Sequence, residues 1–318
     1  MAPDPATPPE TEELLSRCSF PPAGTRVTLA VSGGPDSMAL LALACAAGLE
    51  AVAVHVDHGL RHGSDAEPQL VERAATHLGA GFESRTVAVE PGPDLEARAR
   101  RARYAVLPPG VMTGHTMDDQ AETMLINLLR GAGLDGLAGM LRASPPGALR
   151  PQRPLLGLRR TETTALCDSL GLDVVHDPSN DDPAFVRNRL RSEVLPLLCE
   201  VAGRDVVPVL ARQAELIAGE ADLLDGLAAG LDPRDARALR EAPAPLARRA
   251  VRGWLRSTEE MHPPSAAEVA RVMAVAEGLV RACELSGGRR VARSEGRLRL
   301  EGAPVYLGGA PAGMVGGP

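Results

Sequence analysis

Short apolar runs alternate with segments of helical length along the first two thirds of the chain, and this alternation constrains the fold more than any other feature. Four segments are predicted as helices, at 35–48, 64–78, 94–107 and 117–131. Strands that alternate with helices of about 10–15 residues are typical of an α/β fold, a doubly wound parallel sheet. Five segments have the composition of its strands: RVTLAVS (26–32), EAVAVHV (50–56), FESRTVAV (82–89), GVMTGH (110–115) and LDVVHD (172–177).

The pattern changes near residue 202. From there to about residue 307 the sequence is mostly helical and shows no buried strands. We therefore expect a larger domain at 1–205 and a smaller, mostly helical domain at 206–307. The remaining GGAPAGMVGGP (308–318) predicts a disordered tail.

Composition excludes several classes of function. All 34 basic residues among the 318 are arginine, so the chain can have neither a Walker A loop nor a lysine Schiff base. The five cysteines are dispersed and form no CxxC pair, which disfavours a zinc or iron–sulfur centre and fits a cytoplasmic protein. The sequence contains no run of 18 apolar residues, so no membrane span is expected.

The loop SGGPDS has the composition of a phosphate-binding turn, and its members are Ser32, Gly33, Gly34, Pro35, Asp36 and Ser37. Its glycines let backbone amides approach an anion, and the helix N-terminus that follows adds partial positive charge. The proline fits a first helical turn, and the two hydroxyls can bond phosphate oxygens. Asp36 would repel a phosphate unless a cation lay between them, so its position predicts Mg²⁺. For a glycine pair alone, an ordinary strand-to-helix turn would be an equal alternative.

Other polar residues follow the predicted strands, at 55–61, 115–122 and 177–180. In parallel sheets ligands bind beyond the carboxyl ends of the strands, so these loops and SGGPDS predict one active site. Asp119 and Glu122 lie i, i+3 on one helix face, and both carboxylates can address one cation. Acids at a helix start are also favoured by the helix dipole, but beside His115 and opposite SGGPDS the functional interpretation is favoured.

Arginine gathers in separate segments of this acidic chain, whose formal net charge is −7. The segments are 98–103, the acid-free 141–160, 187–191 and 289–299. Surface arginine is commonplace in a chain without lysine, but several clusters on separate elements indicate a patterned RNA-binding face. The residues expected on it are Arg100, Arg103, Arg187, Asn188, Arg191, Arg289 and Arg290.

The motifs also resemble a known family. SGGPDS is similar to the PP-loop of the N-type ATP pyrophosphatases, which split ATP into AMP and pyrophosphate. Together with it, four further segments resemble the bacterial tRNA(Ile)-lysidine synthetases, also called synthases. These are HVDHGLRHGSDAE (55–67), LEARARRARY (95–104), TGHTMDDQAETMLINLLRGAGLDGLAGM (113–140) and HDPSNDDPAFVRNRLRSEVLPLL (176–198). The resemblance covers roughly 25–200, and LSGGRRVARSEGRLRLEG (285–302) resembles the end of that family's substrate-binding domain. The chain is similar to the short type, without the longer members' last domain.

The resemblance implies ATP-dependent attachment of L-lysine to the wobble cytidine of tRNA(Ile) with a CAU anticodon, with ATP as substrate and Mg²⁺ on Asp36. It assigns catalysis to 1–205 and tRNA binding to 206–307, and a second copy of the chain is a further candidate partner. His55 and His58 are expected to shape the nucleotide pocket. A metal site of three histidines is the alternative there, but no further Cys or His cluster supports it.

The same resemblance implies roles for the remaining candidates. Asp119 and Glu122 would receive the lysine ammonium, and His115 and Arg187 would hold the activated intermediate or its phosphate. Two other functions stay open. A tRNA thiolase of the same superfamily would favour clustered cysteines. A non-catalytic nucleotide-binding module would need neither Asp36 nor the pair of carboxylates.

Overall fold

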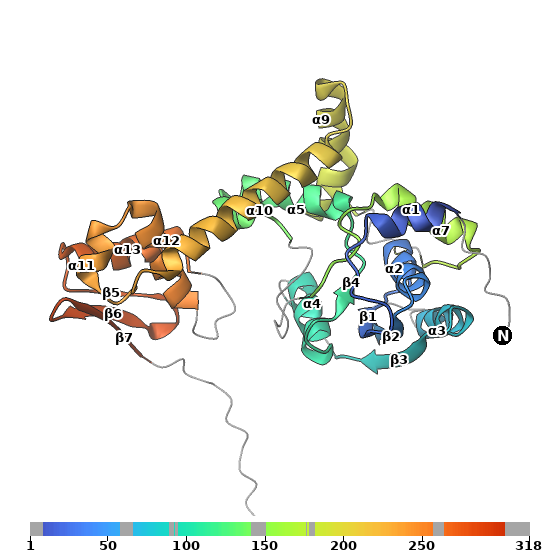
Figure 1. Ribbon diagram of the computed structural model, residues 1–318, viewed down its shortest axis with the longest axis horizontal. Helices are drawn as coiled ribbons and strands as arrows, with labels where there is room; N and C mark the ends of the chain where they lie inside the picture. Colours follow the sequence, from blue (N-terminus) through green and yellow to red (C-terminus); the bar gives the residue numbers. More distant parts are fainter. Residues whose placement is uncertain are drawn as a thin grey trace, which may run out of the picture. The chain divides into compact units, whose positions relative to one another are not determined.

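The computed structural model describes residues 9–57, 66–88, 92, 95–140, 151–175, 177, 182–256 and 264–302. It divides into two compact units, Met1–Ala218 and Gly219–Pro318 (Figure 1). The division falls within the helix α10 (Val207–Ala229), later than the boundary predicted after residue 205. The predicted tail at 308–318 lies outside the described residues.

A parallel sheet forms the centre of the first unit, with its four strands in the order β3–β2–β1–β4. The strands are β1 (Arg26–Ala30), β2 (Glu50–Asp57), β3 (Gly81–Thr86) and β4 (Met112–Thr113). The α/β fold with a parallel sheet is therefore confirmed. The prediction of a fifth strand at 172–177 is wrong for the described residues, which join no ladder. The amide of Val175 instead donates to the carbonyl of Gly33 over 2.9 Å, so this segment lies against the glycine turn.

Two apolar cores cover the two faces of this sheet, which explains why its inner strands are continuous apolar runs. One core joins Val27, Leu29, Val31, Ala51 and Ala53 to the helices α1 (Pro9–Ser16), α2 (Pro35–Ala46), α3 (Glu67–His77) and α7 (Arg160–Ser169). The other joins Ala30, Val52, Val54 and Val56 to α4 (Leu95–Val106). Alternate residues of each strand thus point to opposite faces, and α4 lies across the sheet from α2 and α3 in Figure 1.

The helix α3 begins at Glu67, whereas the capping-box spacing of Ser64 and Glu67 predicts an earlier start. Its N-cap is Ala66, so Glu67 occupies the first helical position and not the third one that a capping box requires. Ser64 itself lies outside the described residues.

The rest of the first unit is helical and brings distant segments together. Its elements are α5 (Met117–Leu129), α6 (Leu134–Leu137), α8 (Val186–Arg189), the π-helical segment η3 (Leu190–Val194) and α9 (Leu195–Ala202). Ala121 and Leu125 of α5 pack in a small core with Leu190, Leu195 and Val207. This contact places the arginines around residue 190 beside the polar face of α5.

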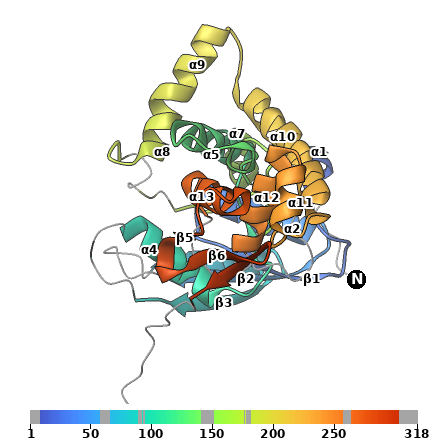
Figure 2. The same ribbon diagram turned by 90° about the vertical axis from the view of Figure 1, so that its left-hand side faces the viewer.

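The second unit combines helices with a sheet. Besides part of α10 it contains α11 (Ala236–Glu241), α12 (Ala244–Arg256), α13 (Ala266–Glu277), the 3₁₀ turn η4 (Ser286–Gly288) and the antiparallel strands β5 (Ala282–Glu284), β6 (Arg290–Ser294) and β7 (Arg297–Glu301). In Figure 2, α12 and α13 lie along one face of the β5–β6–β7 sheet. Val291 and Leu298 are buried beneath them, so the prediction of no buried strands is wrong. The alternation of arginine and leucine in RLRLE (297–301) is the pattern of a half-buried strand, so this part of the signal was present in the sequence.

Among the described residues, no helix has both the length and the apolar character that crossing a bilayer would require.

Glu268 joins α13 to the turn η4, which lies between β5 and β6, and allows a test of this packing. The backbone amides of Ser286 and Ser265 donate to its two carboxylate oxygens over 2.9 and 2.8 Å. These hydrogen bonds lower the pKa of Glu268 to about 2. The stabilisation they provide is therefore complete above the ordinary pKa of 4.5 and is lost as the pH falls toward 2.

We expect Glu268→Gln to lower the free energy of unfolding of the second unit by about 3 kcal/mol at pH 7, with the difference shrinking between pH 4.5 and 2. Trp254, the chain's one tryptophan, packs against the core of this unit, so its fluorescence in urea reports the transition. Glu277→Gln, on an exposed site of the same helix, is the control and should have little effect. A difference that does not change with pH would show that the loss comes from replacing an acceptor oxygen by an amide NH₂ group, and not from the charge.

Candidate active site

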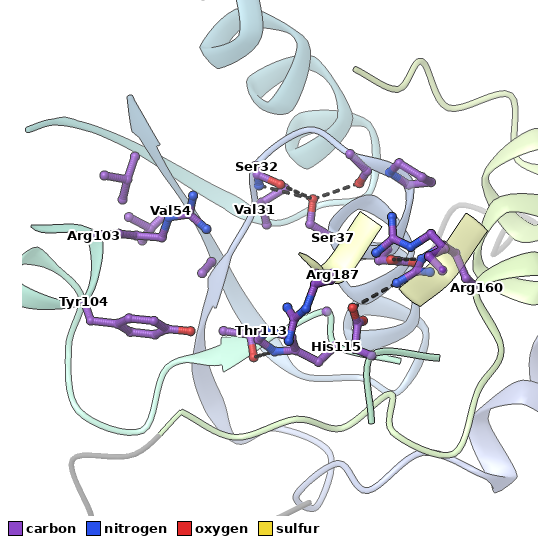
Figure 3. A pocket seen from close by; sticks show the side chains of 18 of the residues that line it. Val31, Ser32, Ser37, Val54, Arg103, Tyr104, Thr113, His115, Arg160 and Arg187 are labelled. Atoms are coloured by element: carbon purple, nitrogen blue, oxygen red, sulfur yellow. Dashed lines mark hydrogen bonds and ion pairs between the residues drawn. The ribbon is translucent and has the colours of Figure 1, made fainter. Parts of the chain in front are cut away.

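A cavity of about 500 Å³ lies at the carboxyl ends of β1, β2 and β4 (Figure 3). This is the edge of a parallel sheet where ligands are expected. It is lined by residues from the segments 30–37, 54–56, 103–104, 113–119 and 185–191, and by Arg160. The SGGPDS loop and the region around His115 thus meet as predicted, whereas the first turn of α7, which contributes Arg160, was not anticipated.

The SGGPDS loop is held in shape by its own hydrogen bonds. The amide of Ser32 donates to the hydroxyl of Ser37 over 3.2 Å, and that hydroxyl donates to the carbonyl of Gly34 over 2.8 Å. Gly33 has φ +89°, a conformation that favours glycine, and a Cβ there would lie 2.8 Å from a methyl carbon of Val175. Pro35 lies in the first turn of the 12-residue helix α2. The loop therefore presents a fixed helix N-terminus to the cavity, as an anion site requires.

Three acidic side chains converge on the guanidinium of Arg160. Its Nε lies 3.3 Å from Asp36 Oδ2, its Nη2 lies 2.9 Å from Asp119 Oδ1, and its Nη1 lies 3.1 Å from Glu122 Oε1. Thr163, three residues further along α7, donates to Asp36 Oδ1 over 2.5 Å. The prediction that Asp36, Asp119 and Glu122 lie near one another therefore agrees with the structure, but the cation between them is supplied by the chain.

Glu122 differs from the other two carboxylates because it is fully buried and does not line the cavity. Besides Arg160, its oxygens contact Arg191 over 2.8 and 3.3 Å and Arg187 over 3.5 Å. All three arginines line the cavity. One buried carboxylate thus orients three guanidiniums toward the space beside the SGGPDS loop.

The carboxyl groups of the cavity have different pKa values. Burial raises the pKa of Asp36 to about 6, against the opposing effects of the Thr163 hydroxyl and Arg160. Burial also acts on Asp119, but there Arg160, then His115, outweigh it and hold the pKa below its ordinary value. Asp119 is therefore ionised at neutral pH. A cation that approaches Asp36 would favour the ionised form of its carboxyl group.

Asp119 also fixes the start of α5. Its Oδ2 accepts the backbone amide and the hydroxyl of Thr116 over 2.9 and 3.1 Å, in a capping box. Only Oδ1 is turned toward Arg160. His115, just before the helix, has its Nδ1 2.7 Å from the hydroxyl of Thr113 and lines the cavity.

The other predicted residues are distributed as follows. His55 is buried, with Nδ1 3.0 Å from the carbonyl of Val31, and does not line the cavity, whereas His58 lies outside the described residues. The cavity lining includes Arg103, Arg187, Asn188 and Arg191. Figure 3 shows Arg103 and Tyr104 on the opposite side of the cavity from Arg160. The side chain of Arg100 is not described.

The structure corrects one expected RNA contact in the second unit. Arg289 is 2% exposed and donates to the carbonyls of Ser286 and Leu255, so its guanidinium supports the chain from within. Arg290 is half exposed and pairs with Glu301 over 3.3 Å. Burial therefore leaves Arg290, and not Arg289, able to reach a phosphate.

The residues present fit a magnesium ion that is completed by substrate phosphates. Among the described residues, no group of three or more His, Cys, Asp or Glu side chains could hold a metal by itself. Magnesium in nucleotide sites commonly takes one or two carboxylates and the phosphates of the substrate. Asp36 is a carboxylate of the SGGPDS loop and lines the cavity, which satisfies that requirement.

Gly114 is the residue on which the approach of β4 to the SGGPDS loop depends. A Cβ at this position would overlap the carbonyl oxygen of Asp36 and would lie 2.7 Å from its carbonyl carbon. Because both neighbours are backbone atoms, Gly114→Ala has to push Asp36 out of place. We expect a loss of stability of about 1–3 kcal/mol and a weaker affinity for ATP, measured by thermal unfolding and by equilibrium binding.

Gly133→Ala is the matched control, because Gly133 has φ −79° and no atom lies within 4 Å of a Cβ there. It should leave ATP affinity unchanged. A Gly114→Ala protein that binds ATP like the wild type would contradict the proposed contact between β4 and the loop.

Two family models match parts of this chain. Residues 9–198 match the family model of the PP-loop domain, and 235–299 match that of the TilS substrate binding domain. The chain is 42% identical to the tRNA(Ile)-lysidine synthase of Nocardia farcinica over 298 residues, which cover 89% of this chain and 91% of that protein. It is 46% identical to the tRNA(Ile)-lysidine synthase of Mycolicibacterium paratuberculosis over 242 residues, 72% of this chain and 74% of that one.

A solved structure shares the fold. The U34-tRNA thiolase NcsA from Methanococcus maripaludis superposes with a TM-score of 0.52 and 17% identity, over 66% of this chain and 79% of that chain. At this identity the likeness concerns the fold alone. The two family models and the extent of the two sequence matches decide the family: the chain belongs to the tRNA(Ile)-lysidine synthases, which are PP-loop proteins.

Proposed function

We propose that this chain is an ATP-dependent ligase that joins L-lysine to the wobble cytidine of tRNA(Ile) with a CAU anticodon. The products are lysidine, AMP and pyrophosphate, and the modified tRNA reads AUA in place of AUG. Within a chain of this family, one observation carries the proposal. A phosphate-binding turn, an ionised carboxylate and three arginines meet in one cavity at the edge of the sheet.

The chemistry needs an activated base. The C2 carbonyl oxygen of cytosine is a poor leaving group, and transfer of AMP to that oxygen makes it part of a phosphate ester that leaves easily. The amides of the SGGPDS loop and the arginines that line the cavity are suited to stabilise the charge of pyrophosphate as it departs. Mg²⁺, when held by Asp36, would neutralise part of the same charge.

The second step needs lysine as a free amine. An ammonium group with a pKa of about 10.4 is not a nucleophile, so it has to be bound and then deprotonated. Asp119 is suited to bind it, because it lines the cavity and its pKa is held low. Glu122 is buried behind the arginines, which supports a different role from the one predicted: it orients Arg187 and Arg191 toward the phosphate of the intermediate.

The target base has to leave the stack of the anticodon loop to enter this site, as in other enzymes that modify bases. Residues that line the cavity on the side away from Arg160 are then placed to contact it, and Arg103 is the foremost of them. Affinity for the tRNA backbone would come from exposed arginines such as Arg290. A second copy of the chain and a cytoplasmic location stay predictions from the sequence.

Mass spectrometry of the anticodon fragment tests the whole proposal. After incubation with ATP, isotopically labelled lysine and the tRNA, we expect the label on the wobble cytidine and release of pyrophosphate that depends on the tRNA. Sulfur on the tRNA would favour the thiolase, although no cysteine lines the cavity in the part of the chain that the structure describes. Binding of ATP with no product would leave only a nucleotide-binding module.

Asp36→Ala should reduce the release of pyrophosphate by about 10²-fold or more, because the carboxylate that would hold Mg²⁺ against the phosphates is lost. The measurement is pyrophosphate release with tRNA present. Asp168→Ala removes an exposed carboxylate further along α7 and should leave turnover unchanged. Wild-type turnover in a folded Asp36→Ala protein would remove Asp36 from the proposed mechanism.

Asp119→Asn keeps the size of the side chain and removes its charge. We expect lysine transfer to slow by about tenfold or more, with a smaller effect on adenylation, because only the second step uses the ammonium. Adenylated tRNA trapped without lysine separates the two steps. Equal damage to both would place Asp119 with the metal and not with lysine.

A further inference from the structure

Arg160 contacts every carboxylate that the proposed function uses, although it comes from neither the SGGPDS loop nor α5. Its Nε, Nη1 and Nη2 each reach a different acidic residue, over 3.3, 3.1 and 2.9 Å. These residues are Asp36 on α2, and Asp119 and Glu122 on α5. Among the described residues, no other arginine joins the two helices in this way.

We propose that Arg160 is a positioning residue that holds the carboxylates of Asp36, Asp119 and Glu122 in one cluster. It thereby fixes the distance between the part of the site that binds pyrophosphate and the part that binds lysine. The proposal rests on the proposed function, because the activity assays that test it measure the ligase reaction. The geometry favours positioning over direct contact with a substrate, because each of the three guanidinium nitrogens is already engaged by a carboxylate.

The backbone around Arg160 is fixed as well. Its own amide donates to Asp118 Oδ2 over 2.8 Å, and the side chain of Glu162 accepts the amide of Arg159 over 2.7 Å, so the first turn of α7 is capped. Thr163 from the same turn donates to Asp36. Two side chains from the first turn of α7, Arg160 and Thr163, thus contact Asp36. Such fixed contacts are expected of a positioning residue and not of a mobile surface arginine.

The charges in the cluster balance without a ligand. Asp36, Asp119 and Glu122 face Arg160, Arg187 and Arg191, so three carboxylates meet three guanidiniums. Removal of the central guanidinium leaves like charges side by side, and Glu122 has no access to water with which to offset them. The carboxylates are then expected to separate, which misplaces Asp36 and Asp119 together.

The test compares Arg160→Ala with Arg159→Ala. The two arginines are adjacent, and their side chains are similarly buried, at 22% and 25% exposure. Arg159 pairs with Asp118 and Asp205 and does not line the cavity. We expect Arg160→Ala to slow both adenylation and lysine transfer by about 10²-fold and to raise the KM for lysine, while Arg159→Ala keeps wild-type rates.

Guanidinium ion added to the Arg160→Ala protein provides a readout that general damage to the fold would not give. We expect millimolar guanidinium to restore activity at least tenfold in Arg160→Ala and to have no such effect on the wild type. Arg160→Lys should recover only part of the rate, because one ammonium cannot reach three carboxylates in a fork. If Arg160→Ala does not fold, Arg160→Lys serves in its place, and wild-type rates in that protein would overturn the proposal.

A measurement without substrates separates this proposal from the proposed function. In a double-mutant cycle of Arg160→Ala and Asp119→Asn, the shifts in thermal unfolding midpoint should be clearly non-additive, because each change removes the partner of the other. Additive shifts together with equal activity of the Arg160→Ala and Arg159→Ala proteins would overturn the role of Arg160. A wild type that never attaches lysine would instead overturn the proposed function, while a non-additive cycle would leave the cluster in place.

Discussion

The interaction on which the site depends is the set of ion pairs around Glu122 and Arg160. A carboxylate without access to water is costly, and removing one partner of such a buried pair typically costs about 3–5 kcal/mol. Ion pairs with three arginines offset this cost for Glu122. One of them, Arg160, also pairs with Asp36 and Asp119. The same contacts that make the buried charge tolerable also fix the distance between the phosphate-binding turn and α5.

The parallel sheet makes this cluster possible. Because β1, β2 and β4 run in the same direction, the loops that follow them open at one edge, and α7 reaches that edge by packing on α2. Gly114 allows β4 to approach the backbone of Asp36, and Gly33 leaves room for Val175. The phosphate-binding turn is therefore enclosed by backbone on two sides, so its amides and hydroxyls are held before a nucleotide arrives.

Local patterns in the sequence predicted much of the fold and part of the site. The apolar strands, the proline at the start of α2 and the i, i+3 acids on α5 are short-range signals, and each agrees with the structure. The fifth strand failed because Val175 bonds the glycine turn instead of a neighbouring strand. The sheet of the second unit was missed because its strands are short and only RLRLE of β7 alternates strictly, whereas RVARS of β6 does not.

By itself, the sequence determined the α/β class, the glycine turn before α2 and the family to which the chain belongs, because these depend on residue types at short spacings. The tertiary structure decided how the charges are paired. Arg160 lies in a run of arginines expected on an RNA face, and Arg289 in another, yet one is at the centre of the carboxylates and the other is buried among carbonyls. No local pattern distinguishes an arginine that binds RNA from one that pairs inside the protein, because its partners are distant in sequence and meet only when the chain folds.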